Sequence, residues 1–332
     1  MEFTKIEKYL LANVFMLPKS GEKITVEILE KIKVLNPVEN SDWQSAIKNL
    51  SEKGLLLEED GIYSISEEAN TMAVKIIKEH REKRFSEILV KFERSEVYGS
   101  FCERLYGRNL SQLNMTPMDQ LDKLLELLNL DKNSHVLDLA CGVGKITEYI
   151  SDTTNAKVTG VDFAVQAIQL AQVRNKDKID RINFVVGDMN NLQFEENSFD
   201  AIIAIDTVDF AEDLEEMIGK LKEITKNGGQ MGIFYSEKSQ SEEYIENLKS
   251  DNTKLAKVLK KHNLEYQVYN YTEEEKSFHK KSLQLAEGMK DEFENAGDTG
   301  TYESRVSESK HALTSINDGR ISRHLYIVKV EK

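Results

Sequence analysis

Short apolar segments alternate with amphipathic helical segments from residue 134 onward. Strands are predicted at 135–141, 157–163, 182–189, 199–206, 230–236, 265–272 and 321–330. Parallel strands need a crossover connection, and a helix is the usual one, so this alternation predicts βαβ units around a parallel sheet. The polar, largely helical stretch 273–320 is too long for a plain connection and is predicted as an insertion.

The first 75 residues show a different pattern and are predicted to form a separate unit. Apolar side chains recur at helical spacing near the start, over 26–35 and from Trp43 onward. Two short strand-like runs then flank an Asp60–Gly61 turn. Three helices followed by a hairpin is the order of a winged helix. Such a unit would bind DNA, mediate dimerisation or cover a substrate.

Acidic side chains outnumber basic ones. The chain of 332 residues holds 44 Lys and Arg against 58 Asp and Glu, a formal net charge of −14. Its first 75 residues contain no arginine and carry a net charge of −4. Tight sequence-independent binding of nucleic acid needs clustered Lys and Arg, so the composition disfavours nucleic acid as a partner.

Cysteine content and hydropathy narrow the class of protein further. Cys102 and Cys141 are too few for a disulfide framework or a Cys-rich zinc site, so no metal is expected. No run approaches the ~20 apolar residues of a membrane span. The first residues include Glu2 and Glu7 and are typical of a helix rather than a signal peptide. These features predict a soluble, cytoplasmic protein.

The segment VLDLACGVGKITEYI, residues 136–150, is the most informative motif. An apolar strand leads into a turn that contains Gly142 and Gly144, and a helix follows. Glycine allows a tight turn and a close approach to a ligand, and a helix N-terminus offers free N–H groups. The dinucleotide motif G-x-G-x-x-G is excluded, because Thr147 stands at the third glycine position. Asp138 precedes the turn, where a carboxylate can face an ammonium group.

Carboxylates also end the next two strands. Asp162 lies at the end of the second strand, where it can accept hydrogen bonds from both hydroxyls of a ribose. Asp188 and Met189 end the third strand, and such a pair can bond an adenine amino group and cover the ring. The ligand that these positions describe has an ammonium, a ribose and an adenine, and no phosphate.

From about residue 118 to 236, and on to the last strand, the chain resembles the class I S-adenosylmethionine-dependent methyltransferases. The family's glycine motif is an acidic residue followed by G-x-G-x-G, and here Ala140 replaces its first glycine. The resemblance implies an α/β, Rossmann-like seven-stranded sheet over 118–332, with strand order 3-2-1-4-5-7-6 and the last strand antiparallel. It implies S-adenosylmethionine as the cofactor and makes 76–117 a helical linker that covers it.

The resemblance assigns ten residues to the cofactor: Asp138, Ala140, Gly142, Gly144, Asp162, Phe163, Asp188, Met189, Ile205 and Gln112. Within that set, the glycine turn and Ile205 face the methionine moiety, and Gln112 its carboxylate. Asp162 binds the ribose, while Phe163 and the Asp188–Met189 pair flank the adenine. The alternative is a Rossmann-like fold with a different nucleotide site.

The methyl acceptor is expected past the fourth and fifth strands, under the N-terminal elements and a helical lid at 273–320. The candidate catalytic residues are Asp206, Tyr235 and His279, with His311 as another base in the insertion. The candidate substrate-binding residues are Tyr98, Tyr106, Asp209, Tyr302 and Arg305. Gly297 and Gly300 predict a flexible joint for the lid. Alternatively, Asp209 caps a helix, the two earlier tyrosines form a core seam, and the insertion is a surface excursion.

Together these features predict methyl transfer from S-adenosylmethionine to nitrogen or oxygen of a small-molecule acceptor. The Pro-Pro and Pro-Cys motifs of many nucleic-acid methyltransferases are absent, since the only prolines are Pro18, Pro37 and Pro117. RNA or protein methylation and a cofactor-binding regulator without turnover are the alternatives. A homodimer through the N-terminal unit is also expected, because Trp43 and the 55–57 run are large apolar groups for a small unit to bury alone.

Overall fold

The computed structural model describes residues 2–16, 24–25, 27–29, 43–239 and 242–332. It divides the chain into two compact units, Met1–Phe85 and Ser86–Lys332. The boundary predicted at residue 75 lies inside helix α4 (Glu67–Arg94), so no separate linker begins there. The sequence of α4 contains neither glycine nor proline, and the helix therefore continues through the predicted boundary.

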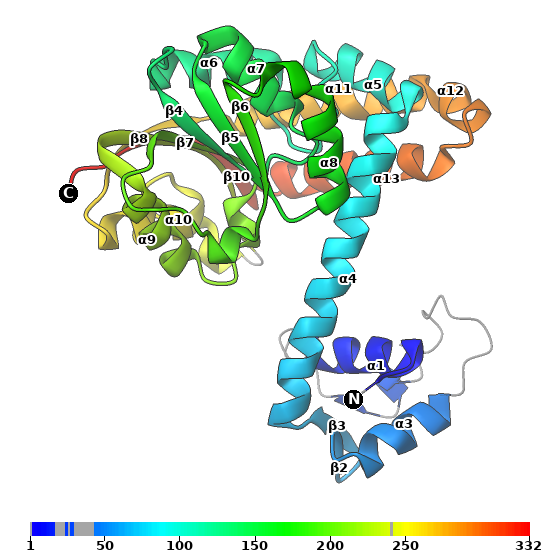
Figure 1. Ribbon diagram of the computed structural model, residues 1–332. Coiled ribbons are helices and arrows are strands. Elements are labelled where there is room, and N and C mark those ends of the chain that lie inside the picture. The colour runs from blue at the N-terminus through cyan, green and yellow to red at the C-terminus, as the bar shows by residue number, and fades with distance from the viewer. Residues whose placement is uncertain (1, 17–23, 26, 30–42, 240–241) are drawn as a thin grey trace. The chain divides into compact units, whose positions relative to one another are not determined.

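The first unit contains helices and a small antiparallel sheet (Figure 1). Its elements are α1 (Lys5–Met16), β1 (Ile24–Thr25), α3 (Trp43–Glu52), β2 (Leu56–Glu59) and β3 (Ile62–Ile65), and the strand order is β1-β3-β2. The hairpin predicted at Asp60–Gly61 is present, and both turn residues have the positive φ that a type I′ turn requires. Most of the helix predicted over 26–35 lies outside the described residues, so the winged helix stays a prediction.

This unit buries most of the apolar groups that suggested a dimer. Trp43, Leu55 and Leu56 lie in its core beside Leu10 and Leu50. Leu57, the last residue of the predicted run, is 46% exposed, and the homodimer stays a prediction.

The second unit is built on a seven-stranded sheet of order β6-β5-β4-β7-β8-β10-β9. The strands are β4 (His135–Leu139), β5 (Lys157–Asp162), β6 (Ile182–Val186), β7 (Phe199–Ile205), β8 (Thr225–Lys238), β9 (Glu265–Asn270) and β10 (Ile321–Lys329). Numbered within the sheet, this is the predicted order 3-2-1-4-5-7-6. Strand β10 is antiparallel to both β8 and β9, so the prediction of an antiparallel last strand is confirmed.

Helices cover both faces of this sheet (Figure 1). The helices that follow or precede its strands are α6 (Met118–Leu128), α7 (Lys145–Thr154), α8 (Val165–Arg174), α9 (Leu214–Ile224) and α10 (Lys254–Lys261). Leucines of α6 pack with Ile150 of α7 on one side, while Met217, Leu221 and Leu259 of α9 and α10 pack on the other. Apolar residues on both faces of the central strands make them nearly continuous hydrophobic runs. No helix among the described residues has the length and apolar character to cross a membrane.

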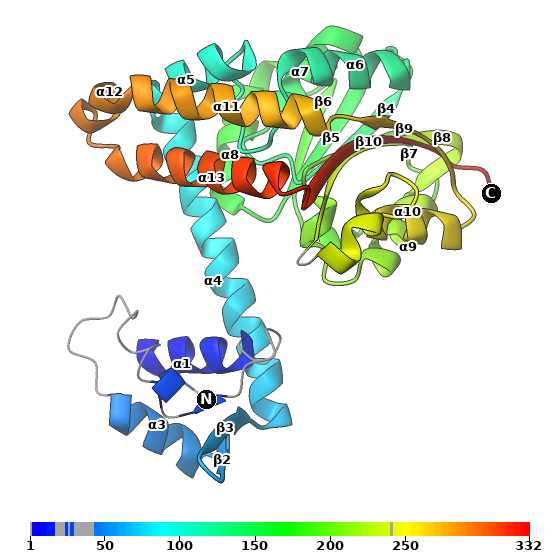
Figure 2. The same ribbon diagram turned by 180° about the vertical axis from the view of Figure 1, so that it is seen from behind.

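The predicted insertion is helical and packs against residues 86–117, here called the covering segment. It contains α11 (Thr272–Gly288), α12 (Lys290–Asn295) and α13 (Thr299–Asn317), and α11 and α13 lie side by side (Figure 2). The covering segment contributes the end of α4, helix α5 (Glu96–Tyr106) and the loop to residue 117. Phe101 of α5 meets Phe293 of α12 edge-on, with ring centroids 6.0 Å apart, inside one shared apolar cluster.

The joint between α12 and α13 is anchored rather than flexible. Gly297 has a positive φ, but the next residue, Asp298, is buried and its carboxylate lies 2.6 Å from Lys91 Nζ of α4. Ser95 and Thr301 also donate hydrogen bonds to this carboxylate. Burial alone would raise the pKa of Asp298, yet these partners hold it below its usual range. The insertion is therefore fixed to the covering segment at this point.

Replacing Asp298 with Asn should lower the free energy of unfolding by about 1–2 kcal/mol, because the hydrogen bonds from Lys91 and Ser95 lose a charged acceptor. Urea denaturation of the full chain measures the change. The exposed Asp291→Asn on α12 is the matched control and should stay within about 0.5 kcal/mol of wild type. Equal stability of both variants would show that the joint is not anchored by this carboxylate.

Candidate active site

The turn after β4 has an unusual backbone. Ala140, Gly142 and Gly144 all have φ between 55° and 71°, in the left-handed region. A Cβ on Gly144 would lie 2.3 Å from Phe184 Cε1, so this position has no room for another residue. Ala140 is exposed and meets no such obstacle, although a left-handed alanine costs roughly 1–2 kcal/mol. The departure from the glycine motif thus leaves the turn in place.

Two buried carboxylates support this turn. Asp162 Oδ2 accepts the N–H of Gly142 at 2.9 Å, and its Oδ1 accepts the N–H of Ala164 at 2.8 Å. Asp138 Oδ2 accepts the hydroxyl of Thr147 at 2.6 Å. Burial raises the pKa of Asp138 to about 7, against the pull of Thr147, and the charge of Asp162 adds to the increase. Burial likewise raises the pKa of Asp162.

The adenine candidates lie beside this turn, at the carboxyl ends of β5, β6 and β7. Asp188 accepts hydrogen bonds from the backbone and side chain of Asn190, which fix its carboxylate. Met189 Sδ accepts the hydroxyl of Thr207, and Phe163 packs with Leu89 of α4. Carboxyl ends of neighbouring parallel strands meet at one edge of the sheet, which is where α/β folds bind ligands.

Gln112, in the covering segment, is buried with an unsatisfied amide. It is 2% exposed, and its Oε1 accepts the N–H of Leu110 at 3.2 Å. Its Nε2 has no hydrogen-bond partner. An unpaired buried donor costs about 1–3 kcal/mol, so it calls for an acceptor that the chain itself does not supply.

Ion pairs hold the covering segment on the glycine turn. Glu93 of α4 lies 2.8 Å from Lys145 Nζ at the start of α7 and 3.1 Å from Arg174 at the end of α8. The Ser111 hydroxyl donates to Glu93 and accepts from Lys145, while Arg174 also donates to the carbonyl of Val143. On the apolar side, Leu89 reaches the turn so closely that a Cβ on Gly142 would lie 3.1 Å from it.

Asp206 was predicted as catalytic, and the structure contradicts this. Its two carboxylate oxygens pair with both terminal nitrogens of Arg323 on β10, a residue that is fully buried. Asp206 Oδ2 also accepts the N–H of Met115 at 2.9 Å, and Arg323 donates to Thr116 at 2.8 Å. Both oxygens are therefore occupied by an ion pair that fixes the covering segment, and no lone carboxylate remains to accept a substrate proton.

Tyr235 and Asp209 also differ from expectation. The Tyr235 hydroxyl donates to Glu237, and burial raises its pKa far above the usual value, so it cannot serve as a base near neutrality. Asp209 is exposed and does not cap the helix after β7; Asp213 does, accepting the N–H groups of Glu215 and Glu216. Ile205 is half-buried at the end of β7, as the cofactor assignment requires.

The two tyrosines of α5 belong to the core. Tyr98 stacks on Phe92 with centroids 3.9 Å apart and donates its hydroxyl to the carbonyl of Gln112 at 2.6 Å. Tyr106 donates to the carbonyl of Asn114 at 2.7 Å. Both rings are buried with their hydroxyls used, in a cluster inside the second unit rather than in a seam between two domains. The ring of Tyr106 also lines a small cavity. Tyr302 packs against the same cluster.

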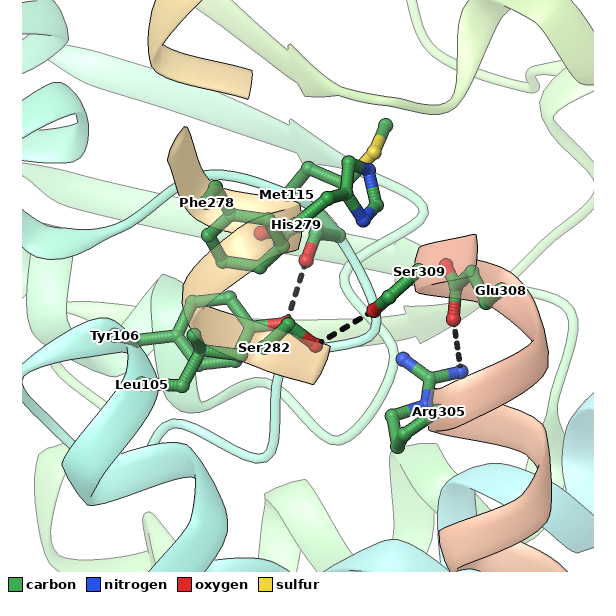
Figure 3. A pocket seen from close by; sticks show the side chains of 10 residues that line it. Leu105, Tyr106, Met115, Phe278, His279, Ser282, Arg305, Glu308 and Ser309 are labelled. Atoms are coloured by element: carbon green, nitrogen blue, oxygen red, sulfur yellow. Dashed lines mark hydrogen bonds and ion pairs between the residues drawn. The ribbon is translucent and has the colours of Figure 1, made fainter. Parts of the chain in front are cut away.

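His279 and Arg305 meet at a small cavity between α11, α13 and the covering segment, here called the α11–α13 cavity (Figure 3). Its volume is about 10 Å³, room for one water molecule. His279 is buried and its Nε2 lies 3.7 Å from Glu275 Oε1. Arg305 pairs with Glu308 at 2.6 Å. His311, by contrast, is exposed on α13.

Arg323 and Glu93, whose ion pairs hold the covering segment in place, are not among the residues predicted from the sequence. Arg323 could have been found, because it stands inside the apolar run ISRHLYIVKV. A guanidinium buried with such a strand needs an anionic partner. Glu93 had no comparable signal, since it lies in a helix rich in charges. Among the described residues, no group of three or more His, Cys, Asp or Glu side chains could hold a metal ion.

Residues 130–293 match the family model described as a methyltransferase domain. This part of the chain is a class I methyltransferase domain. Such domains use S-adenosylmethionine, and the geometry fits it: the unpaired amide of Gln112 suits a carboxylate, and each Asp162 oxygen keeps a free lone pair for ribose hydroxyls.

Curated relatives match parts of this chain that are 105 to 145 residues long. A sterol 24-C-methyltransferase of Gibberella zeae is 34% identical over 136 residues, which cover 40% of this chain and 35% of that protein. The methyltransferase GfsG of Streptomyces halstedii is 29% identical over 114 residues, covering 34% of this chain and 41% of that protein. The matched region thus spans less than half the length of these relatives.

Solved structures show the same fold. Phosphoethanolamine N-methyltransferase 2 of Haemonchus contortus, in complex with phosphomonomethylethanolamine and S-adenosylhomocysteine, aligns with a TM-score of 0.59 at 20% identity. The alignment covers 75% of this chain and 61% of that one. Geranyl diphosphate C-methyltransferase of Streptomyces coelicolor aligns with a TM-score of 0.53 at 14% identity, covering 71% of this chain and 82% of that one.

Replacing Asp206 with Asn should lower the free energy of unfolding by about 3–5 kcal/mol, because it leaves the buried charge of Arg323 without its anionic partner. Urea denaturation measures the loss. The exposed Asp177→Asn, far along the chain from this pair, serves as the control and should change stability by no more than about 0.5 kcal/mol. A stable D206N protein would reopen a catalytic role for this carboxylate.

The raised pKa of Asp138 should appear in the pH dependence of stability. Its pKa is about 7 in the folded chain, against 3.8 for an ordinary aspartic acid side chain. Below about pH 4 the carboxyl is protonated in both states; as the pH rises to 7, only the unfolded chain loses the proton, so stability falls, by up to roughly 4 kcal/mol. Asp138→Asn should remove this part of the decrease. Parallel wild-type and D138N curves between pH 4 and 8 would contradict the assignment.

Proposed function

We propose that this chain transfers a methyl group from S-adenosylmethionine to a small-molecule acceptor. The observation that carries the proposal is the glycine turn held by Asp162, with the unpaired Gln112 amide buried in the segment that covers it. In this assignment Asp162 binds the ribose, Gln112 the methionine carboxylate, and Asp188 and Met189 the adenine. When bound, the cofactor supplies an electrophilic methyl group.

The chain's own residues contribute alignment and exclusion of water, which are the main needs of a methyl transfer. The covering segment closes over the glycine turn through Leu89 and the ion pairs of Glu93. The Asp206–Arg323 pair holds Met115 and Thr116 of that segment. We place the acceptor beneath the helices of the insertion, where His279 and Arg305 are the polar groups that the core packing leaves available.

Nitrogen or oxygen of a metabolite is our preferred methyl acceptor. The acidic composition argues against RNA. The packing of the helical insertion against the covering segment supports a lid of the kind that closes over a small molecule. The curated relatives include enzymes named for methylation of a sterol carbon, so a carbon acceptor is the first alternative to test. We also propose that the protein acts in the cytoplasm. A homodimer through the first unit remains a proposal.

Calorimetric titration of the full chain with S-adenosylhomocysteine and with NAD tests the cofactor assignment. The homocysteine compound should bind and NAD should not. Asp162→Ala should abolish binding, and Gln112→Ala should weaken it about 10-fold to 100-fold, because a hydrogen bond to a charged group is lost. The exposed Gln284→Ala on α11 is the control for the amide and should bind as wild type does.

Turnover is then measured as transfer of labelled methyl from S-adenosylmethionine to amines, phenols and sterols. Failure of S-adenosylhomocysteine to bind would refute the proposed function. Binding without methyl transfer to any acceptor class would favour a cofactor-binding regulator instead.

A further inference from the structure

The α11–α13 cavity contains buried polar atoms that the chain leaves unsatisfied. His279 is 2% exposed, and neither of its ring nitrogens has a hydrogen-bond partner. Arg305 uses a terminal nitrogen to pair with Glu308, but its Nε has no partner. Each such atom costs about 1–3 kcal/mol when it has no hydrogen-bond partner, so three of them, on two side chains that line one small cavity, call for a bound polar group.

The hydrogen-bonding capacity of these atoms selects the kind of group. Arg305 Nε can only donate, whereas a neutral imidazole has one nitrogen that must accept. A hydroxyl can serve either group, since its oxygen can accept from Arg305 Nε and its proton can be donated to a neutral imidazole. An ammonium cannot accept from Arg305, and a carboxylate has no proton to offer His279.

Local charge argues against an anion as well. On α13, Arg305 is neutralised by Glu308. On α11, Glu275 Oε1 lies 3.7 Å from His279 Nε2, and its other oxygen is unpaired. Two further cations lie nearby: Lys281 of α11 donates to the carbonyl of Leu105, which lines the cavity, and Arg323 of β10 pairs with Asp206. The groups around His279 therefore sum to no positive charge that would attract a carboxylate or phosphate while the imidazole is neutral.

One wall of the cavity suits an apolar body attached to this hydroxyl. Tyr106 and Phe278 face the cavity with ring centroids 5.3 Å apart, and Leu105 and Met115 add apolar surface (Figure 3). The remaining lining residues, Asn114, Ser282, Glu308 and Ser309, are polar, and the Ser309 hydroxyl already donates to that of Ser282. Met115 stands three residues after Gln112 in the covering segment, and its N–H donates to Asp206, which directly follows β7.

We propose that the α11–α13 cavity is the subsite that binds a hydroxyl group of the acceptor, with His279 and Arg305 as its specificity-determining residues. Calling the bound molecule the methyl acceptor rests on the proposed function, whereas the subsite itself is defined by the residues of the cavity. The cavity has the volume of one water molecule, so a larger ligand requires a wider space between α11, α13 and the covering segment.

Three probes with one ring and different polar groups test the proposal: phenol, aniline and benzoate. Each is titrated calorimetrically into the full chain, with and without S-adenosylhomocysteine. Phenol should bind at least tenfold more tightly than aniline or benzoate. His279→Gln and Arg305→Lys should each weaken phenol at least tenfold, while His311→Gln, an exposed histidine on the same insertion, should leave it unchanged.

Chemical shifts of the ¹⁵N-labelled histidines provide a second readout, since phenol should move the ring signals of His279 and not those of His311. Equal affinity for the three probes, or a phenol affinity that is unchanged in both H279Q and R305K, would refute the proposed subsite. If H279Q does not fold, R305K decides, because it keeps a cation on α13 near Glu308 and removes the guanidinium with its Nε donor. Loss of S-adenosylhomocysteine binding with phenol selectivity intact would refute the proposed function and leave the subsite standing.

Discussion

The buried pair of Asp206 and Arg323 connects the parts of this molecule that a ligand would have to meet. It joins the end of β7 to β10, and through Met115 and Thr116 it holds the covering segment. Arg323 lies over the ring of Phe234 on β8 as well, 5.0 Å from its centroid. A guanidinium without water around it needs such an anion, and the pair thereby sets where the roof of the site lies relative to the sheet.

The sheet was predictable because each of its strands is marked by a sequence pattern within a short stretch of the chain. Alternating apolar strands and helices, with glycines after the first strand, led to the correct strand order and antiparallel last strand once the family pattern was seen. The turn residues were identified for the same reason. Ala140 in the left-handed region shows that the backbone of the motif persists where one glycine is absent.

The acceptor side was not predictable in the same way. Asp206 looked catalytic because a carboxylate after a strand has the same appearance whether it meets a substrate or an arginine. Its partner lies 117 residues further along the chain, and no local pattern links the two. Tyr98 and Tyr106 present the same difficulty, since their hydroxyls are consumed by carbonyls of a loop whose course depends on that pair. The residue type indicates which reactions a side chain could support, but the fold decides which polar atoms are left without a partner in the chain.

The loop of the covering segment lies between the two proposed ligand sites and could couple them. Gln112 and Met115 stand three residues apart on one short loop. Gln112 follows Ser111, which accepts a hydrogen bond from Lys145 at the start of α7, and Met115 lines the α11–α13 cavity. If the cofactor orders this loop at Gln112 and an acceptor orders it at Met115, as proposed, each ligand changes the freedom of the loop for the other. Thermodynamic reciprocity would then require that the two ligands alter each other's affinity by the same factor.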